Sequence, residues 1–247
     1  MPTISDTVTT PDGSCDITFA TPAEAHTGPW PGVVMYPDAG GRRQAFTDMA
    51  TRLAGYGYAV LVPDVYYRDA GWAPFDMANV FGDADERARL FAMMRKVTPE
   101  VMARDAVAFF DYLDSHPDVN GSAFGTTGYC MGGRTSLVVA GRVPDRVAAA
   151  MSFHGGGLAS DDPGSPHLLA DQMRAAVYVA GAENDPSFTE EQSQTLDAAL
   201  TEAGVEHTIE FYAAAHGFAV PDNAPYDLSA AHRHWAAMQD FFGAHLR

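Results

Sequence analysis

One short stretch, residues 124–133 (FGTTGYCMGG), constrains the fold of this chain more than any other. A β-prone run leads into Cys130, and an apolar helical pattern follows it. Gly128 and Gly132 flank the cysteine in the order Gly-x-nucleophile-x-Gly. A sharp turn from strand to helix needs glycine at these two positions, because larger side chains would collide there. The stretch therefore predicts a thiol exposed at the apex of a turn, near a helix N-terminus that favours the thiolate.

The alternative interpretation of Cys130 is a small core residue, because most free cysteines have that role. The chain has only 2 cysteines, Cys15 and Cys130, which give no disulfide framework. We expect both to be reduced thiols in a cytoplasm. Cys15, on a predicted edge strand, is expected to be inert. The choice for Cys130 depends on the rest of the chain.

Predicted strands alternate with predicted helices along most of the sequence. This alternation indicates parallel β-α-β units, hence an α/β fold with a doubly wound, mostly parallel sheet and helices on both faces. Residues 8–19 predict an antiparallel hairpin about a Pro-Asp-Gly turn. The other expected strands are residues 32–36, 58–63, 123–129, 147–153, 176–180 and 207–212, and the expected helices are residues 46–56, 98–116, 131–141, 168–174, 189–203 and 226–246.

Length and composition limit the organisation of the chain and its partners. At 247 residues we expect a single domain, 1–247. Residues 64–97 are too apolar for a linker and too broken for one regular element, and are expected to form a lid or substrate loop. The net charge of −17 argues against nucleic acid or an anionic membrane as partner. No secretory leader and no apolar run of roughly 20 residues is seen, so a cytoplasmic location is expected.

Three chemically active residues follow separate predicted strands. Cys130, Asp185 and His216 occur in the order nucleophile, acid, histidine that is typical of the α/β-hydrolase triad. A parallel sheet brings the carboxyl ends of its strands to one edge, where ligands bind. We expect Cys130 to attack a carbonyl carbon, His216 to move the proton, and Asp185 to orient the imidazole.

An oxyanion hole should lie beside this nucleophile. One donor is expected to be the backbone N–H of Met131, directly after the cysteine. The second should come from the loop after Tyr36, and is the N–H of Asp38 or Ala39.

Four segments carry a resemblance to a known family. Residues 128–133 (GYCMGG), 181–185 (GAEND), 216–218 (HGF) and 57–67 (GYAVLVPDVYY) resemble the dienelactone hydrolase family. The resemblance runs from about residue 31 to the C-terminus. It implies a cysteine hydrolase of the α/β-hydrolase fold that acts on lactones or other activated esters without metal or organic cofactor.

Two positions differ from the pattern of that family. Where the family carries a glutamate that helps to activate the thiol, this chain has Pro37 followed by Asp38, which could take its place or only cap the next helix. Where the family carries an arginine four residues after the catalytic histidine, this chain has Val220. Arg134 could bind a substrate carboxylate instead, or pair with an acid as a structural residue.

The chemistry of a thiol nucleophile narrows the substrate independently. A tetrahedral adduct expels a thiolate more readily than an alkoxide, so only good leaving groups let the reaction go forward. Enol esters, strained lactones, thioesters or aryl esters are therefore expected, in an apolar small-molecule pocket. The HGGG-like stretch at His154 lies after the nucleophile, so His154 is expected to be structural. The candidate substrate-binding residues are Tyr36, Ala39, Tyr66, Trp72, Arg134, His154, Phe188 and Phe218.

Other classes of function remain as alternatives. The chain could be a non-catalytic binding or redox-sensing protein with Cys130 as the sensitive thiol, or an enzyme that transfers its acyl group to an acceptor other than water. No metal or nucleotide motif is present. His232 and His234 are two residues apart on a predicted helix and face different ways. We therefore expect no metal and no cofactor, and the oligomeric state is left open.

Overall fold

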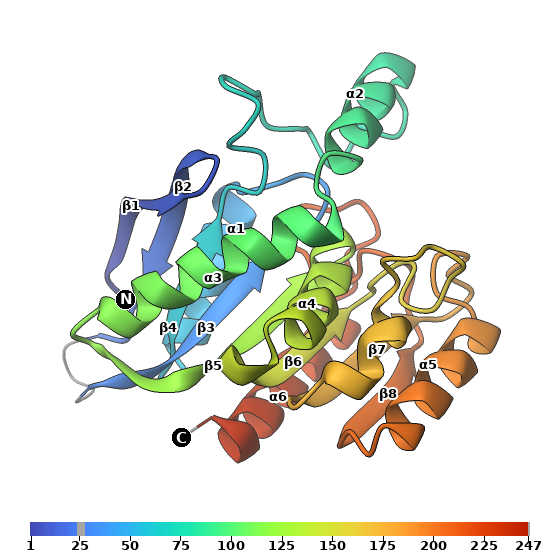
Figure 1. The fold of residues 1–247 in the computed structure, drawn as a ribbon. Coiled ribbons are helices and arrows are strands. Elements are labelled where there is room, and N and C mark those ends of the chain that lie inside the picture. Colours follow the sequence, from blue (N-terminus) through green and yellow to red (C-terminus); the bar gives the residue numbers. More distant parts are fainter. Residues whose placement is uncertain (24–27, 247) are drawn as a thin grey trace.

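The computed structural model describes residues 1–23 and 28–246, and its centre is an eight-stranded sheet (Figure 1). The strand order is β1-β2-β4-β3-β5-β6-β7-β8. β1 and β2 form an antiparallel hairpin, and β2 also runs antiparallel to β4. All the other neighbours are parallel. The predicted α/β class, with its N-terminal hairpin, is confirmed.

The strands and helices have the following bounds. The strands are β1 (Thr3–Thr10), β2 (Gly13–Ala20), β3 (Trp30–Tyr36), β4 (Ala59–Pro63), β5 (Val119–Tyr129), β6 (Val147–Phe153), β7 (Ala176–Ala182) and β8 (His207–Tyr212). The α-helices are α1 (Gln44–Ala54), α2 (Ala84–Met94), α3 (Pro99–Ser115), α4 (Met131–Arg142), α5 (Glu190–Glu202) and α6 (Leu228–His245). The 3-10 helices are η1 (Pro144–Arg146) and η2 (Pro166–Gln172).

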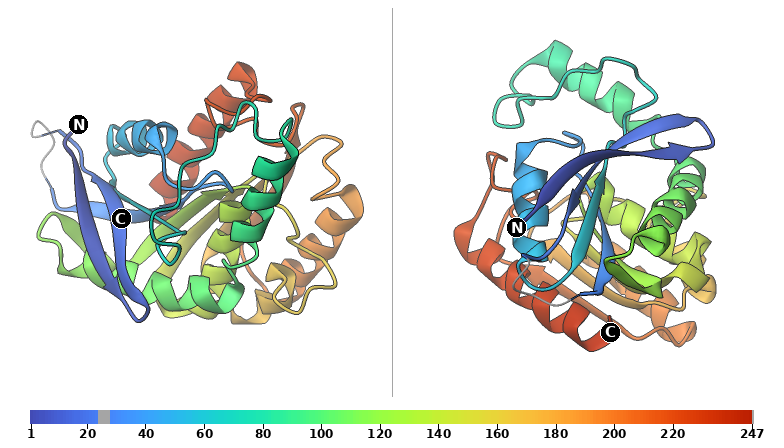
Figure 2. Two further views of the ribbon diagram at one scale, coloured as in Figure 1. Left: turned by 90° about the horizontal axis from the view of Figure 1, so that it is seen from above. Right: turned by 90° about the vertical axis from the view of Figure 1, so that its left-hand side faces the viewer.

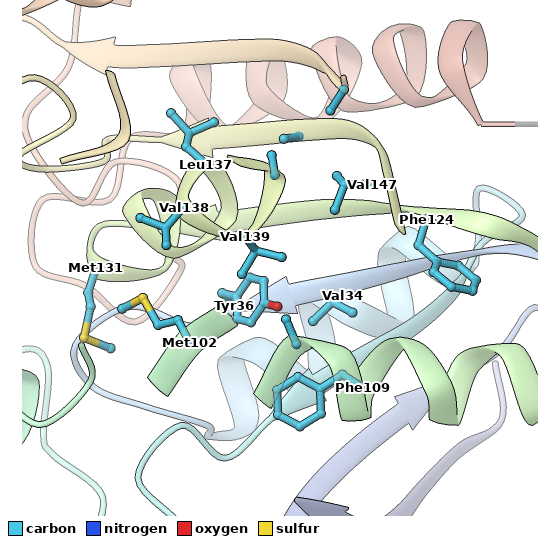
Figure 3. Packing of buried hydrophobic residues seen from close by; sticks show 14 of the residues in the cluster. Val34, Tyr36, Met102, Phe109, Phe124, Met131, Leu137, Val138, Val139 and Val147 are labelled. Carbon is cyan, nitrogen blue, oxygen red and sulfur yellow. The ribbon is translucent and has the colours of Figure 1, made fainter. Parts of the chain in front are cut away.

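Helices cover the sheet on both faces, as the two figures show (Figures 1 and 2). Successive side chains of a strand point to opposite faces, so Val34 packs in one apolar cluster and Val33 in the other. The cluster that contains Val34 also takes side chains from α3 and α4 (Figure 3). Leu196 and Leu200 of α5 belong to it too. The cluster that contains Val33 takes side chains from α1 and α6. A parallel sheet buried on both faces accounts for the apolar strands of the sequence.

Local sequence signals fix where several helices begin. Thr98 caps α3, and Pro99 occupies its first turn, where no amide donor is needed. Thr189 and Gln192 form a reciprocal capping box at the start of α5. Asp227 accepts a hydrogen bond from the amide of Ala230 and caps α6.

Two expected elements differ from the structure. The helix expected at residues 168–174 is the 3-10 helix η2, which starts at a proline and is too short for a stable α-helix. The region 64–97, expected to be irregular and too broken for one regular element, contains the helix α2 among irregular segments. α2 buries only Leu90 and Met93, and Asp83 caps it through the amides of Asp85 and Glu86.

α2 stands apart from the layered body of the molecule (Figures 1 and 2). Together with the start of α3, it walls a cavity that reaches Cys130 at the carboxyl end of β5. Within residues 1–23 and 28–246, no helix is long and apolar enough to cross a membrane.

Candidate active site

Cys130 lies at an abrupt turn between β5 and α4. Its backbone has φ 55 and ψ −116, a region that non-glycine residues rarely adopt. The turn is held on both sides. The Cys130 amide donates to the carbonyl of Phe153 at 3.1 Å, and the Cys130 carbonyl accepts from the amide of Gly133 at 3.0 Å. The partly exposed thiol therefore projects from a backbone that its neighbours hold in a strained conformation.

The two flanking glycines leave no room for a side chain. A Cβ on Gly128 would lie 1.9 Å from the carbonyl oxygen of Gly132. A Cβ on Gly132 would lie 2.2 Å from the carbonyl oxygen of Tyr36. Both contacts are with backbone, which cannot move aside as a flexible side chain can. The Gly-x-Cys-x-Gly pattern is thus explained by close approach of β3, β5 and α4.

His216 and Asp185 lie next to each other at the same edge of the sheet as Cys130. His216 Nδ1 is 2.6 Å from Asp185 Oδ2. Asp185 is 5% exposed, and its other oxygen accepts from the hydroxyl of Ser187 at 2.6 Å and from the Ser187 amide at 2.9 Å. Cys130, Asp185 and His216 all line one cavity. The structure therefore brings the three predicted residues together.

The electrostatics of this group favour a charged imidazole. Burial alone would lower the pKa of His216, but the hydrogen bond to Asp185 and the interaction with Cys130 outweigh it and raise the pKa to about 10. Burial alone would raise the pKa of Asp185, but hydrogen bonds from His216 and Ser187 lower it below its usual value. An ionised Asp185 can therefore hold the proton on Nδ1 of His216 and leave Nε2 for chemistry.

Backbone amides suited to an oxyanion lie beside the thiol. Met131 is the first residue of α4, so its amide has no acceptor within the helix. Ala39 lines the same cavity, and its carbonyl accepts a 2.8 Å hydrogen bond from the hydroxyl of Tyr66. That hydroxyl also lies 3.9 Å from Met131 Sδ. Tyr66 thus fixes the loop after β3 next to the start of α4.

Asp38 is 1% exposed and is fully engaged by other residues of the protein. Its Oδ1 accepts from Arg43 Nη1 at 2.6 Å and from the Gly40 amide at 2.9 Å, and its Oδ2 accepts from Arg43 Nη2 at 3.0 Å and Asn223 Nδ2 at 3.1 Å. Arg43 Nε also donates to Asp222 at 2.7 Å. Asp38 and Arg43 therefore join the loop after β3 to the segment that follows His216.

The cavity at Cys130 has a volume of about 990 Å³, but few of the predicted substrate-binding residues line it. Ala39 and Arg134 do. Phe188 lines a separate hollow beside Asp185. Trp72 donates from Nε1 to Asp64 instead. Four others, Tyr36, Tyr66, His154 and Phe218, are buried at 2% exposure or less and are absent from its wall.

The aromatic residues were expected in the pocket because aromatic side chains suggest an apolar small-molecule site. They pack instead on the sheet and on one another, as the ring of Phe218 does at 5.0 Å from that of His154. His154 is fully buried with φ 40, and its ring centroid lies 5.2 Å from that of His216. Burial lowers the pKa of His154 well below its usual value, so this imidazole is neutral. The ring of His154 packs beside the ring of His216.

Sequence reasoning missed two parts of the site. Ser187, two residues after Asp185, binds that carboxylate and lies 3.2 Å from His216 Nδ1. Its position in an Asp-x-Ser turn was the available signal. The second part is the set of individual residues that form the apolar wall of the cavity, because the sequence indicated residues 64–97 only as a lid or substrate loop. Its members are Leu90, Phe91, Met94, Val97 and Met102.

In the part of the chain that the structure describes, no group of three or more His, Cys, Asp or Glu side chains is placed to hold a metal ion. His232 is exposed, whereas His234 is buried and lies 2.9 Å from the hydroxyl of Tyr129. The two histidines therefore face different environments, as their spacing predicted.

A nucleophile elbow at the end of β5, with acid and histidine after β7 and β8, is the arrangement of an α/β-hydrolase. Within that class the chain belongs to the dienelactone hydrolase family, whose sequence model matches residues 16–246. The chain is accordingly a hydrolase of the dienelactone hydrolase type.

Individual relatives agree with this assignment. A carboxymethylenebutenolidase homologue from Synechocystis sp. is 26% identical, with 97% of this chain and 96% of its own length covered. The carboxymethylenebutenolidase of Rhodococcus opacus is also 26% identical, with 91% of this chain and 85% of its own length covered. Among solved structures, a dienelactone hydrolase-like promiscuous phosphotriesterase from metagenomic libraries superposes with a TM-score of 0.75 at 27% identity, and all of both chains is covered.

Proposed function

We propose that this protein is a cysteine-dependent hydrolase of activated esters or lactones that uses Cys130, His216 and Asp185. The observation that supports it most is geometric. A thiol at a strained strand-to-helix apex shares one cavity with His216, whose Nδ1 lies 2.6 Å from a buried carboxylate. A strained backbone such as that of Cys130 is typical of functional sites.

Acylation starts from the Cys130 thiolate and the His216 imidazolium, the pair that forms when His216 takes the proton of the thiol. The thiolate sulfur attacks the carbonyl carbon of the ester, and the carbonyl electron pair moves onto oxygen. The Met131 amide and an amide of the 38–39 segment donate hydrogen bonds to that oxyanion. The oxyanion collapses, the bond to the leaving oxygen breaks, and the imidazolium of His216 gives its proton to the leaving group.

Deacylation repeats the sequence with water. His216 takes a proton from water, and the resulting hydroxide attacks the thioester carbonyl carbon. The new tetrahedral adduct expels the Cys130 thiolate, and the carboxylic acid leaves. A thiolate leaves a tetrahedral adduct more readily than an ordinary alkoxide does. Acylation therefore goes forward only with a substrate whose leaving group departs at least as readily as the thiolate. A strained lactone, an enol ester or an aryl ester meets this condition.

The relatives add support for the substrate class. One matched relative is named as a carboxymethylenebutenolidase, which is a lactone hydrolase. At the family position where an arginine binds the substrate carboxylate, this chain has Val220, which is fully buried. We therefore propose an ester or lactone that does not depend on that carboxylate contact. A single functional domain, a cytoplasmic location and the absence of nucleic-acid partners remain predictions.

The experiment that tests this proposal compares the two cysteines. Cys130→Ser should lower kcat/KM for p-nitrophenyl acetate by about a thousandfold or more, because an oxygen nucleophile is a poorer fit to this thiol mechanism. Cys15→Ser is the matched control, since Cys15 is a fully buried residue of β2 and lies outside the cavity. Its kcat/KM should stay within about twofold of the wild type if the variant folds.

The two alternatives make different predictions in the same assay. A binding or redox-sensing protein would release no nitrophenol above the background rate, and the Cys130→Ser variant would then change ligand affinity alone. An acyl transferase would form product esters when alcohols are added. Undiminished hydrolysis by Cys130→Ser would overturn the proposed mechanism.

A further inference from the structure

The cavity at Cys130 extends well beyond the reacting groups. We call its far part the apolar chamber, formed by Leu90, Phe91, Met94, Val97 and Met102. Met102 and Met131 gather at one end of the packed cluster in Figure 3, and both line the cavity. Met131 directly follows Cys130, so an apolar path leads from the nucleophile into the chamber.

α2 exposes large apolar side chains toward this space. Phe91 is 41% exposed, and Phe81, just before the helix, is 54% exposed. Both line the cavity. Large aromatic side chains gathered on one exposed concave surface typically mark a site for an apolar ligand. Arg89 of α2 contacts Glu86 at 2.7 Å and donates to the carbonyl of Ala73 at 3.0 Å.

The charged groups of the cavity wall are matched or lie at its exposed side. Arg134 Nη2 lies 3.0 Å from Asp162 Oδ2. The Gly164 amide and Arg134 lower the pKa of Asp162, so this carboxylate is ionised and offsets the charge of Arg134. Arg95, the other cation of the wall, is exposed to solvent. The wall away from the reacting groups is thus largely apolar, and its one part-buried cation, Arg134, pairs with Asp162 while its buried Nε has no hydrogen-bond partner among the described residues.

The size of the cavity agrees with a ligand larger than a simple lactone. At about 990 Å³ it is at the upper end of the roughly 300–1,000 Å³ of small-molecule sites. An acetyl group or a single small ring would leave most of it filled with water.

We propose that the apolar chamber binds a bulky apolar group of the substrate, an alkyl chain or a fused aromatic ring, attached to the acyl carbon or to the leaving oxygen. This inference rests on the proposed function at Cys130. It makes α2 the element that selects substrates, while the carboxyl ends of β5, β7 and β8 carry the reaction.

Two ester series test the inference on the unmodified protein. The first keeps the p-nitrophenyl leaving group and lengthens the acyl chain from acetate to butyrate to octanoate. The second compares phenyl acetate with 2-naphthyl acetate. We expect kcat/KM to rise at least about tenfold along one series, because each methylene moved from water into the chamber favours binding. The intrinsic reactivity of the esters does not rise in this way.

A pair of tryptophan variants locates the effect on α2. Met94→Trp fills the chamber and should reduce the ratio of kcat/KM for the preferred bulky ester over acetate by about tenfold. Ala92→Trp adds the same side chain to the exposed side of the same helix, outside the cavity, and should leave that ratio unchanged. Far-UV circular dichroism and thermal unfolding show whether each variant folds.

The outcomes separate this inference from the function on which it rests. If kcat/KM rises along neither series while acetate is hydrolysed through Cys130, the chamber inference is wrong and the hydrolase remains. An equal loss of ratio in Met94→Trp and Ala92→Trp would also overturn it. If no ester is hydrolysed above background, the proposed function itself fails. If Met94→Trp does not fold, the two ester series still decide.

Discussion

The elbow at Cys130 and the helix α2 border the same cavity but are built differently. At the elbow, backbone lies against backbone, and a single added carbon would come within 2.2 Å of the Tyr36 carbonyl. In α2, only Leu90 and Met93 are buried, and Phe91 is 41% exposed. At the elbow, the position of the nucleophile depends on backbone contacts that leave no room for an added side chain. The residues of α2, by contrast, can change while the fold is kept, because few of them are buried.

The largest expected effect is on the reacting edge, at His216. His216→Gln removes the only proposed proton carrier and should lower kcat/KM for p-nitrophenyl acetate about a thousandfold, within the range for general acid–base groups. Its matched control is His232→Gln, an exposed position on α6, which should change kcat/KM less than twofold. Similar losses in both variants, or none in His216→Gln, would contradict the account.

The next effect tests the sterics of the elbow. Gly132→Ala should reduce the free energy of unfolding by more than about 4 kcal/mol, because the new methyl group would overlap the backbone of β3. Gly243→Ala is the control, since Gly243 lies in α6 with nothing within 4 Å of its added Cβ. That variant should be stabilised by about 0.5–1 kcal/mol. Urea unfolding measures both, and a mild effect of Gly132→Ala would refute the steric argument.

A somewhat smaller effect is expected at the ion pair behind the elbow. Arg43→Met leaves the buried Asp38 carboxylate without its bidentate partner and should cost about 3 kcal/mol of unfolding free energy. The control, Arg174→Met, breaks an exposed pair with Asp145 and should cost less than about 1 kcal/mol. Denaturant midpoints at equal m-value compare the two. Equal costs would mean that Asp38 and Arg43 do not anchor the loop.

The smallest change concerns the pH profile. His216 must be protonated to serve the leaving group, and its pKa is about 10, so kcat/KM should fall as the pH rises through about 10. Asp185→Asn removes the negative charge that raises this pKa, and should move the alkaline limb to lower pH by about one unit or more. Asp197→Asn, at the separate pair with His207, should leave the limb in place. If kcat/KM of Asp185→Asn falls at the same alkaline pH as in the wild type, Asp185 does not act through His216.

Sequence reasoning succeeded where the determinants are local. The strand, the glycines that flank Cys130 and the helix after it form one short contiguous pattern, even though Gly132 also approaches Tyr36 of β3. The expected strand 147–153 matches β6, which is almost wholly buried, and the expected strand 207–212 matches the edge strand β8. The order of Cys130, Asp185 and His216 predicted their meeting, since parallel strands end at one edge.

Sequence reasoning failed for residues whose position depends on contacts between distant parts of the chain. Tyr36 and Phe218 are aromatic, as pocket residues often are. Both are instead buried in the apolar clusters between the sheet and the helices that cover it. Asp38 pairs with Arg43, five residues away, and with Asn223, 185 positions away, and only the fold brings all three together. α2 was not predicted as a helix, although Leu90, Phe91 and Met94 on it line the cavity, and it buries only Leu90 and Met93.

The most direct test of the central claim is mass spectrometry of the intact protein during brief exposure to p-nitrophenyl acetate. The account predicts one acetyl adduct, located on Cys130 by peptide mapping, that disappears on standing in the wild type. In the His216→Ala variant, formation and loss of the adduct should both be greatly slowed. Turnover of the ester with an adduct on another residue, or on Cys130 with a lifetime indifferent to His216, would contradict the account.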